Sequence, residues 1–335
     1  MVLAAVFLNR FVAVALGLSF CPIASFAQAS SQNPQPAASS HVQVPVQSRL
    51  YYVTTPRSTL EIEAHSVPAD DEGRFAHLKA EFAKAGCGDD MMRVQPVVEK
   101  PGAAANLICT WPGNSAFSIV VVAHYRHEGK GEGAIENWSG AILLPYLYLA
   151  VQAQPRENTF VFLESYGEAG TADYMKSLTR EQKRQIRAVV SVEALGVSPV
   201  TRYYTPYPDT RWMPASSVHL KIALLLATLA DNRVARPDAV TPHWLSIDDS
   251  QPFRYSDVPC ILLHSIPYQS AALPGSRNDT AAAVDGNAYY QNYRAIAVYL
   301  VDLDRLAEKL KSDDPVWHGV GGQFHLDLND LPLLR

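Results

Sequence analysis

The sequence predicts an α/β fold with a doubly wound, mixed but mostly parallel sheet and helices on both faces. Three observations lead to this prediction. Apolar runs alternate along the chain with segments of helical spacing. Residues 117–123 (FSIVVVA) form a continuous apolar run, which is typical of a strand buried on both faces. Ionisable residues follow such runs, and doubly wound sheets place their sites at the carboxyl ends of their strands.

The alternation predicts five strands and five helices. The expected strands are residues 106–110, 117–123, 159–164, 188–194 and 260–265. The expected helices are residues 75–85, 139–152, 172–187 with a break at Thr179, 218–230 and 288–310. Strands that are separated by helices favour parallel pairing.

Composition excludes one large class of function. The chain has 335 residues and a formal net charge of −5, without a basic run. Nucleic-acid binding needs clustered Lys and Arg to neutralise phosphates, so we do not expect a nucleic-acid partner. The hydrophobic fraction of 48% suits an ordinary globular domain.

The first 27 residues resemble a bacterial-type signal peptide, which predicts an exported protein, periplasmic or secreted. Arg10 precedes an almost entirely apolar run, and the small residues Ser25 and Ala27 stand where a signal peptidase reads. A membrane anchor is the alternative, although the run is short for a span of roughly 20 residues. No later stretch predicts a membrane span. Residues 28–49 (rich in Pro, Ser and Gln) predict a disordered tether, residues 50–310 one domain and residues 311–335 a C-terminal tail.

Export permits a disulfide bond among the cysteines of the mature chain. These are Cys87, Cys109 and Cys260, and Cys87 with Cys109 is one candidate pair. Three small buried residues without a disulfide are the alternative.

Ionisable side chains recur at the predicted strand ends. His124, the stretch 164–168, Glu193 and His264 each close an apolar run, and Glu136 lies in the Gly-rich stretch after His124. One imidazole and several carboxylates at one sheet edge suit a zinc ion. Ordinary polar loops at strand ends explain the same residues without a metal.

The order of these segments resembles the M28 family of zinc exopeptidases. The resemblance rests on six pieces in sequence order between residues 75 and 305: NLICTWPG, IVVVAHYRHEGKGEGAIENWSGA, FVFLESYGEAG, IRAVVSVEALGV, DSQPFRYSDVPCILLHSIPY and NDTAAAVD. It implies an aminopeptidase fold with a metal-activated water and a glutamate that takes the water's proton. It also implies four metal ligands: His124, Glu136, Glu168 and Glu193.

Glu136 and Glu193 stand where the family pattern has Asp, and three further positions lack the expected group. The general-base position carries Gly167, and the position of a supporting Asp carries Arg126, which would bring a cation close to the metal. The last zinc His is expected near Gly275 or Ser276, where the sequence has no His. Six nearby residues could supply the missing base or metal ligand in a remodelled site: His127, Glu128, Glu132, Glu164, His243 and His264.

These departures leave three hypotheses about function. The first is a catalytically impaired M28-like protein that binds a peptide or small-molecule ligand in the old cleft. The second is an active metallo-exopeptidase or amidohydrolase with a remodelled site that holds one zinc ion rather than two. The third is an interaction module of the cell envelope. A fully degenerate site would hold no zinc, and the sequence predicts no oligomeric state.

Overall fold

The computed structural model describes residues 52–98, 105–205, 220–221, 224, 235–239, 249–256 and 258–307. The chain divides into Met1–Val44 and Pro45–Arg335, and the described residues belong to the second unit. The predicted signal peptide, tether, C-terminal tail and His243 lie outside the described residues, as does most of the helix expected at 218–230. No helix in the described part is long and apolar enough to cross a bilayer.

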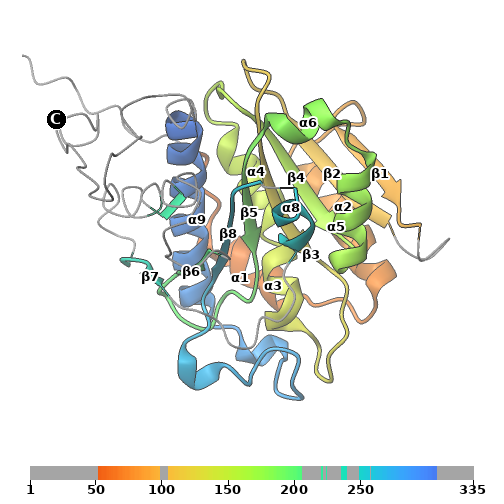
Figure 1. The fold of residues 1–335 in the computed structure, drawn as a ribbon. Helices are drawn as coiled ribbons and strands as arrows, with labels where there is room; N and C mark the ends of the chain where they lie inside the picture. Colours follow the sequence, from red (N-terminus) through yellow and green to blue (C-terminus); the bar gives the residue numbers. More distant parts are fainter. Residues whose placement is uncertain are drawn as a thin grey trace, which may run out of the picture. The chain divides into compact units, whose positions relative to one another are not determined.

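One eight-stranded mixed sheet organises the molecule, in the order β1-β2-β4-β3-β5-β8-β6-β7 (Figure 1). The four central strands β4, β3, β5 and β8 pair in parallel, whereas β2 is antiparallel to both β1 and β4, and β6 is antiparallel to β8. This confirms the mixed, mostly parallel sheet. The strands are β1 (Met92–Pro96), β2 (Ala105–Trp111), β3 (Ser118–His124), β4 (Thr159–Ser165), β5 (Ile186–Val192), β6 (Arg202–Tyr204), β7 (Asp238–Ala239) and β8 (Cys260–His264).

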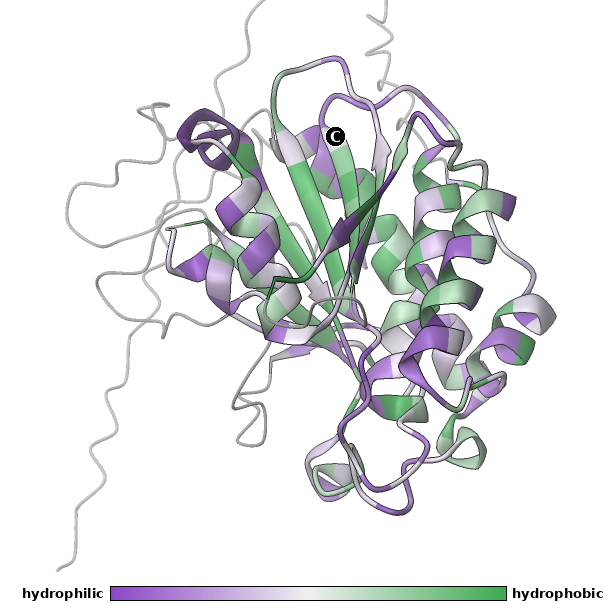
Figure 2. Cartoon of the chain, turned by 90° about the vertical axis from the view of Figure 1, so that its right-hand side faces the viewer, coloured by the Kyte–Doolittle hydropathy of each residue, from purple (hydrophilic) through white to green (hydrophobic). Residues whose placement is uncertain are grey.

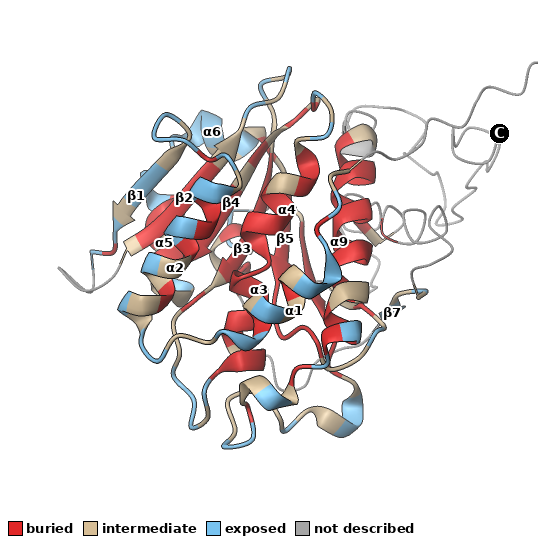
Figure 3. Ribbon diagram, turned by 180° about the vertical axis from the view of Figure 1, so that it is seen from behind, coloured by how far each residue is buried: buried red, intermediate tan, exposed pale blue. Residues whose placement is uncertain are grey.

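Helices cover both faces of the sheet. On one face α1, α2, α4 and α9 enclose the larger apolar core, and on the other α5 and α8 enclose a smaller one (Figures 1 and 3). Figure 2 shows the apolar strands between helices whose hydrophilic residues gather on the outside. The helices are α1 (Arg57–His65), α2 (Asp71–Lys84), α3 (Ser139–Ala141), α4 (Leu144–Val151), α5 (Gly167–Ser177), α6 (Arg180–Gln185), α8 (Gln251–Arg254) and α9 (Gly286–Ala307), with short π or 3-10 turns at η1 (Ala134–Trp138), η2 (Tyr268–Ser270) and η3 (Ala281–Ala283).

Local sequence explains where two of these helices begin. The Asp70 side chain accepts a hydrogen bond from Gly73 N at 2.7 Å and caps α2. Thr179 and Gln182 form a capping box at the start of α6, which is why the predicted helix 172–187 breaks at Thr179.

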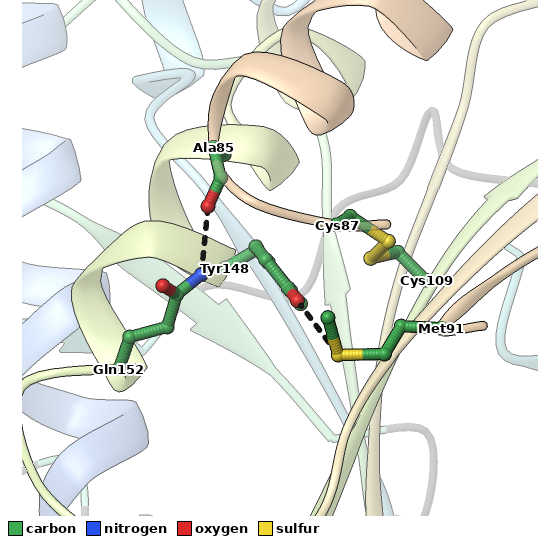
Figure 4. The surroundings of a disulfide bond; sticks show 6 residues. All are labelled: Ala85, Cys87, Met91, Cys109, Tyr148 and Gln152. Atoms are coloured by element: carbon green, nitrogen blue, oxygen red, sulfur yellow. Dashed lines mark hydrogen bonds between the residues drawn. A yellow bond between two sulfur atoms is a disulfide. The ribbon is translucent and has the colours of Figure 1, made fainter. Parts of the chain in front are cut away.

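A disulfide joins Cys87 after α2 to Cys109 in β2, so the candidate pair is confirmed (Figure 4). Around it, Gln152 Nε2 donates to Ala85 O at 2.9 Å, and the Tyr148 hydroxyl meets Met91 Sδ at 3.5 Å. Cys260 is buried in β8 and stands outside the disulfide.

Candidate functional site

Parallel pairing brings the ends of β3, β4 and β5 to one edge of the sheet. His124 is the last residue of β3 and lies beside Ser165, the last residue of β4. Glu193 directly follows β5. The segment before α8 adds Asp249 to this edge, although Asp249 is 125 residues away from His124 in the sequence.

His124 and Asp249 form a buried ion pair. His124 Nδ1 lies 2.6 Å from Asp249 Oδ2, and the side chains are 16% and 2% exposed. Asp249 Oδ1 also accepts a hydrogen bond from the Ser165 hydroxyl at 3.2 Å. This arrangement fixes the ring by its Nδ1 atom and leaves Nε2 for another partner.

Glu193 completes a compact group with these two residues. Glu193 Oε1 accepts hydrogen bonds from the Ser191 hydroxyl at 2.8 Å and from Asp249 N at 3.4 Å. One ligand atom each from His124, Glu193 and Asp249 lies within 4.8 Å of the others. Asp249 was not among the predicted site residues.

The acids of the site dominate the charge state of His124. Burial by itself lowers the pKa of His124, but the charge and hydrogen bond of Asp249, with the charges of Glu193 and Glu136, raise it to about 9. Burial raises the pKa of Glu136, while the nearby His124 opposes that shift. Without a metal, the acids around His124 therefore favour the protonated form of its ring.

Asp279 holds the loop that carries Glu136. The carboxylate of Asp279 accepts hydrogen bonds from Ile135 N at 2.6 Å, from Glu136 N at 3.1 Å and from Gly275 N at 2.8 Å. Asp279 is fully buried, and its backbone oxygen accepts from the Gly-rich stretch as well. The segment NDT resembles an M28 motif, and in the structure its Asp279 holds the loop around Glu136 through these hydrogen bonds.

The position expected for the last zinc His lies beside Glu136. A Cβ atom on Gly275 would stand 2.8 Å from Glu136 Oε2, and Gly275 has a φ of +66°. The His127 ring lies in the same loop, because a Cβ atom on Gly129 would stand 2.7 Å from Gly275 Cα and 2.9 Å from His127 Cε1. Glycine at position 275 lets the backbone approach the Glu136 carboxylate closely.

Glu168 stands apart from the other predicted ligands. It is exposed in the first turn of α5, and like Glu136 it lies outside the compact group of His124, Glu193 and Asp249. Asn106 shapes this turn, because its side chain accepts from Tyr166 N and donates to Gly170 O.

The general-base position lacks a proton acceptor. Gly167 has a φ of +69°, and a Cβ atom built there meets nothing within 4 Å. A Glu at this position would have room for its side chain, but it would adopt a left-handed backbone that costs roughly 1 kcal/mol.

Arg126 contacts residues of its own loop and of the β4 end. Its guanidinium forms an ion pair with Glu128 and lies 5.1 Å from the centre of the Tyr166 ring. The carboxylate partner of His124 is Asp249. The effect of Arg126 on a metal ion at this edge stays a prediction.

Two of the proposed replacements for the lost groups are bound to loop backbone, and two are buried. His127 Nε2 contacts Gly131 O at 3.0 Å inside the Gly-rich stretch, and the Glu132 carboxylate accepts from Ala281 N at 2.7 Å. Glu164 is fully buried, and neither of its carboxylate oxygens has a hydrogen-bond partner in the described part. Burial, followed by the charge of Asp249, raises the pKa of Glu164 well above its ordinary value. His264 is also buried, and burial followed by the charge of Arg202 lowers its pKa to about 3.

Residues 106–300 match the model of peptidase family M28. The chain belongs to this family. No curated protein sequence matches the chain significantly. The family model confirms the resemblance that the six sequence pieces indicated.

Solved structures show the M28 fold at low sequence identity. LapA aminopeptidase of Legionella pneumophila shares 15% identity over 74% of this chain and 71% of its own, with a TM-score of 0.59. A glutaminyl cyclase of an Acidobacteriales bacterium shares 16% sequence identity, and the match covers 76% of this chain and 92% of the cyclase, with a TM-score of 0.56. BSAP, a zinc aminopeptidase from Bacillus subtilis, shares 12% sequence identity, and the match covers 58% of this chain and 49% of BSAP, with a TM-score of 0.51. This M28 chain thus spans about half the length of BSAP.

The donor atoms at the sheet edge fit a zinc ion, the metal that the M28 family and its zinc aminopeptidase neighbours indicate. Zinc accepts imidazole nitrogen and carboxylate oxygen, and its ligand His commonly donates the other ring N–H to a carboxylate. His124 Nε2 and Glu193 are the donors that the geometry offers, with Glu136 beside them and Asp249 orienting the imidazole.

Proposed function

We propose that this M28 protein holds one zinc ion between His124, Glu193 and Glu136 and binds a peptide or small amide ligand there. We propose further that it hydrolyses peptides far more slowly than an ordinary aminopeptidase. The ion would supply a Lewis acid that attracts a carbonyl oxygen. The carboxylates of the site suit the cationic α-amino group of a peptide.

Gly167 is the observation that carries the proposal. Hydrolysis at a metal requires a group that accepts the proton of the attacking water, and glycine has none. Among the described candidates, His127 and Glu132 are bound to loop backbone, and burial disfavours the charged form in which Glu164 would accept a proton. Loss of a general base typically costs 10²–10⁴-fold in rate. Binding needs no such group.

The test compares binding with turnover in one preparation. The zinc-loaded protein and the His124→Ala variant would be titrated with short peptides by calorimetry and incubated with a panel of aminoacyl p-nitroanilides. We expect zinc-dependent peptide binding in the wild type, loss of that binding in His124→Ala, and no His124-dependent release of p-nitroaniline. Turnover at ordinary aminopeptidase rates that disappears in His124→Ala would overturn the proposal.

Cyclisation of an N-terminal glutamine is the second candidate function. It is favoured by coverage, because the match spans 92% of the Acidobacteriales glutaminyl cyclase but 49% of BSAP. In such a cyclisation the substrate's own amine attacks the side-chain amide, so no water has to be activated. Ammonia release from a glutaminyl peptide, absent in His124→Ala, would select this candidate over simple binding.

A further inference from the structure

A second cluster of metal-binding side chains lies on α1 and α2, apart from the cleft. It consists of Glu63 on α1 with His77 and Glu81 on α2, and one ligand atom of each lies within 4.8 Å of the others. His77 and Glu81 are four residues apart and therefore share one face of the helix. Both helices pack on the same core and cover the same face of the sheet (Figure 3). We propose that these three residues form a second divalent-cation site of zinc type.

The donor set and its accessibility suit such an ion. One imidazole and two carboxylates leave a fourth position for water, as in open zinc sites. His77 is 30% exposed, Glu63 17% and Glu81 6%, so an ion has access from solvent to a partly dehydrated cage.

The existing hydrogen bond marks where the ion would sit. His77 Nε2 lies 2.7 Å from Glu63 Oε2, and a shared proton joins them. Two ligands of a tetrahedral zinc at about 2.0–2.1 Å stand roughly 3.3 Å apart. Zinc would therefore take the place of this hydrogen bond and require the two ligand atoms to move apart by about half an ångström, which rotation of the Glu63 and His77 side chains can provide.

Two neighbours of Glu81 act in opposite directions. The Tyr146 hydroxyl donates to Glu81 Oε2 at 2.9 Å and orients the carboxylate. Lys84 Nζ lies 2.5 Å from Glu81 Oε1 and its side chain is 70% exposed. The ammonium of Lys84 competes with a metal ion for this oxygen, so its removal should strengthen metal binding.

Trp138 links the cluster to a measurable signal and to the cleft. Its indole Nε1 donates to Glu63 O at 3.1 Å, and the His77 ring meets the indole edge-on at a centroid distance of 5.5 Å. A paramagnetic ion bound to His77 would quench the fluorescence of this tryptophan. Trp138 is also the last residue of η1, the turn that carries Glu136.

The test is carried out in the His124→Ala protein, so that its outcome does not depend on the proposed cleft metal. The chelator-treated protein would be titrated with Co²⁺ while tryptophan fluorescence and cobalt absorption are followed. We expect quenching with one bound Co²⁺, loss of both signals when His77→Asn is added, and about fivefold tighter binding when Lys84→Gln is added instead.

His65→Asn is the matched control, because His65 is also a helical histidine but contacts only the backbone oxygen of Glu61. It should leave quenching unchanged. If His77→Asn perturbs the circular dichroism spectrum, Glu63→Gln takes its place and should weaken binding at least tenfold. Equal affinity and quenching with and without His77 and Glu63 would overturn the proposal.

Discussion

Replacing Asp249 with Asn should release His124 from its unusual charge state. The pKa of His124 is raised to about 9, against an ordinary value near 6.5, and Asp249 is the largest cause of the rise. Burial opposes the rise, so the variant should lower the pKa of His124 by about two units or more. Each pKa unit corresponds to about 1.4 kcal/mol, so the interaction of Asp249 with the charged His124 ring contributes about 3 kcal/mol.

The sign of the stability effect follows from the same shift. A histidine whose pKa is higher in the folded state stabilises the fold fully below the unfolded pKa, and this contribution disappears as the pH rises through the folded pKa. Asp249→Asn should therefore lower the free energy of unfolding by about 2–3 kcal/mol at pH 6 and by little above pH 9.

Two measurements on the metal-free protein check this. Side-chain NMR would follow the His124 resonance, assigned through His124→Ala, as a function of pH, and urea unfolding would be compared at pH 6 and pH 9.5. The exposed Asp90 provides the control substitution Asp90→Asn, which should alter neither quantity. If Asp249→Asn leaves the pKa of His124 above 8, or destabilises the fold equally at both pH values, the assignment of Asp249 as partner is wrong.

Three further outcomes follow from buried groups elsewhere in the fold. Burial raises the pKa of Asp302 to about 6, and its Oδ2 has no partner in the described part. Asp302→Asn should therefore add about 3 kcal/mol of stability at pH 8 and almost none at pH 4, as measured by urea unfolding. Changing both Cys87 and Cys109 to Ser should cost about 3 kcal/mol, because the bridge closes a loop with a sequence separation of 22, and an unchanged midpoint of thermal unfolding would contradict this. A Cβ atom on Gly140 would stand 2.2 Å from Val192 O, so Gly140→Ala should lower stability by about 1–3 kcal/mol, whereas an unaltered melting temperature would refute that close packing.

The central sheet could be predicted from the sequence because its strands are continuously apolar. The expected strands at 117–123, 159–164, 188–194 and 260–265 became β3, β4, β5 and β8 with changes of at most two residues at their ends. Parallel strands buried on both faces leave this signature in the sequence.

The elements missed by sequence reasoning lack a strong periodic signal. β1 is a polar, half-exposed edge strand, β6 and β7 have three and two residues, and α1 begins after a proline. Their formation depends on pairing with β2, β8 and each other, or on packing against α9, rather than on local pattern.

Only part of the candidate site could be predicted from the sequence. His124 and Glu193 follow apolar strands, and that position indicated a shared sheet edge. Asp249 follows none of the predicted strands, so its approach to His124 is a tertiary contact that no local pattern encodes. The acidic doublet at 248–249, shortly before a buried Phe253, was the available signal. The direction of the Arg126 side chain, toward Glu128 and Tyr166, likewise depends on the folded loop.

The buried charges argue against a purely structural remnant. Taking an imidazolium and several carboxylates out of water is costly, and well-packed apolar residues in their place are often neutral or stabilising. His124, Asp249 and Glu193 are nevertheless held by hydrogen bonds from Ser165 and Ser191, which keep them oriented at the sheet edge. The fold thus maintains polar donors for a ligand while Gly167 supplies no base. Binding requires the former and hydrolysis requires both, and the proposal of ligand capture without efficient cleavage rests on this difference.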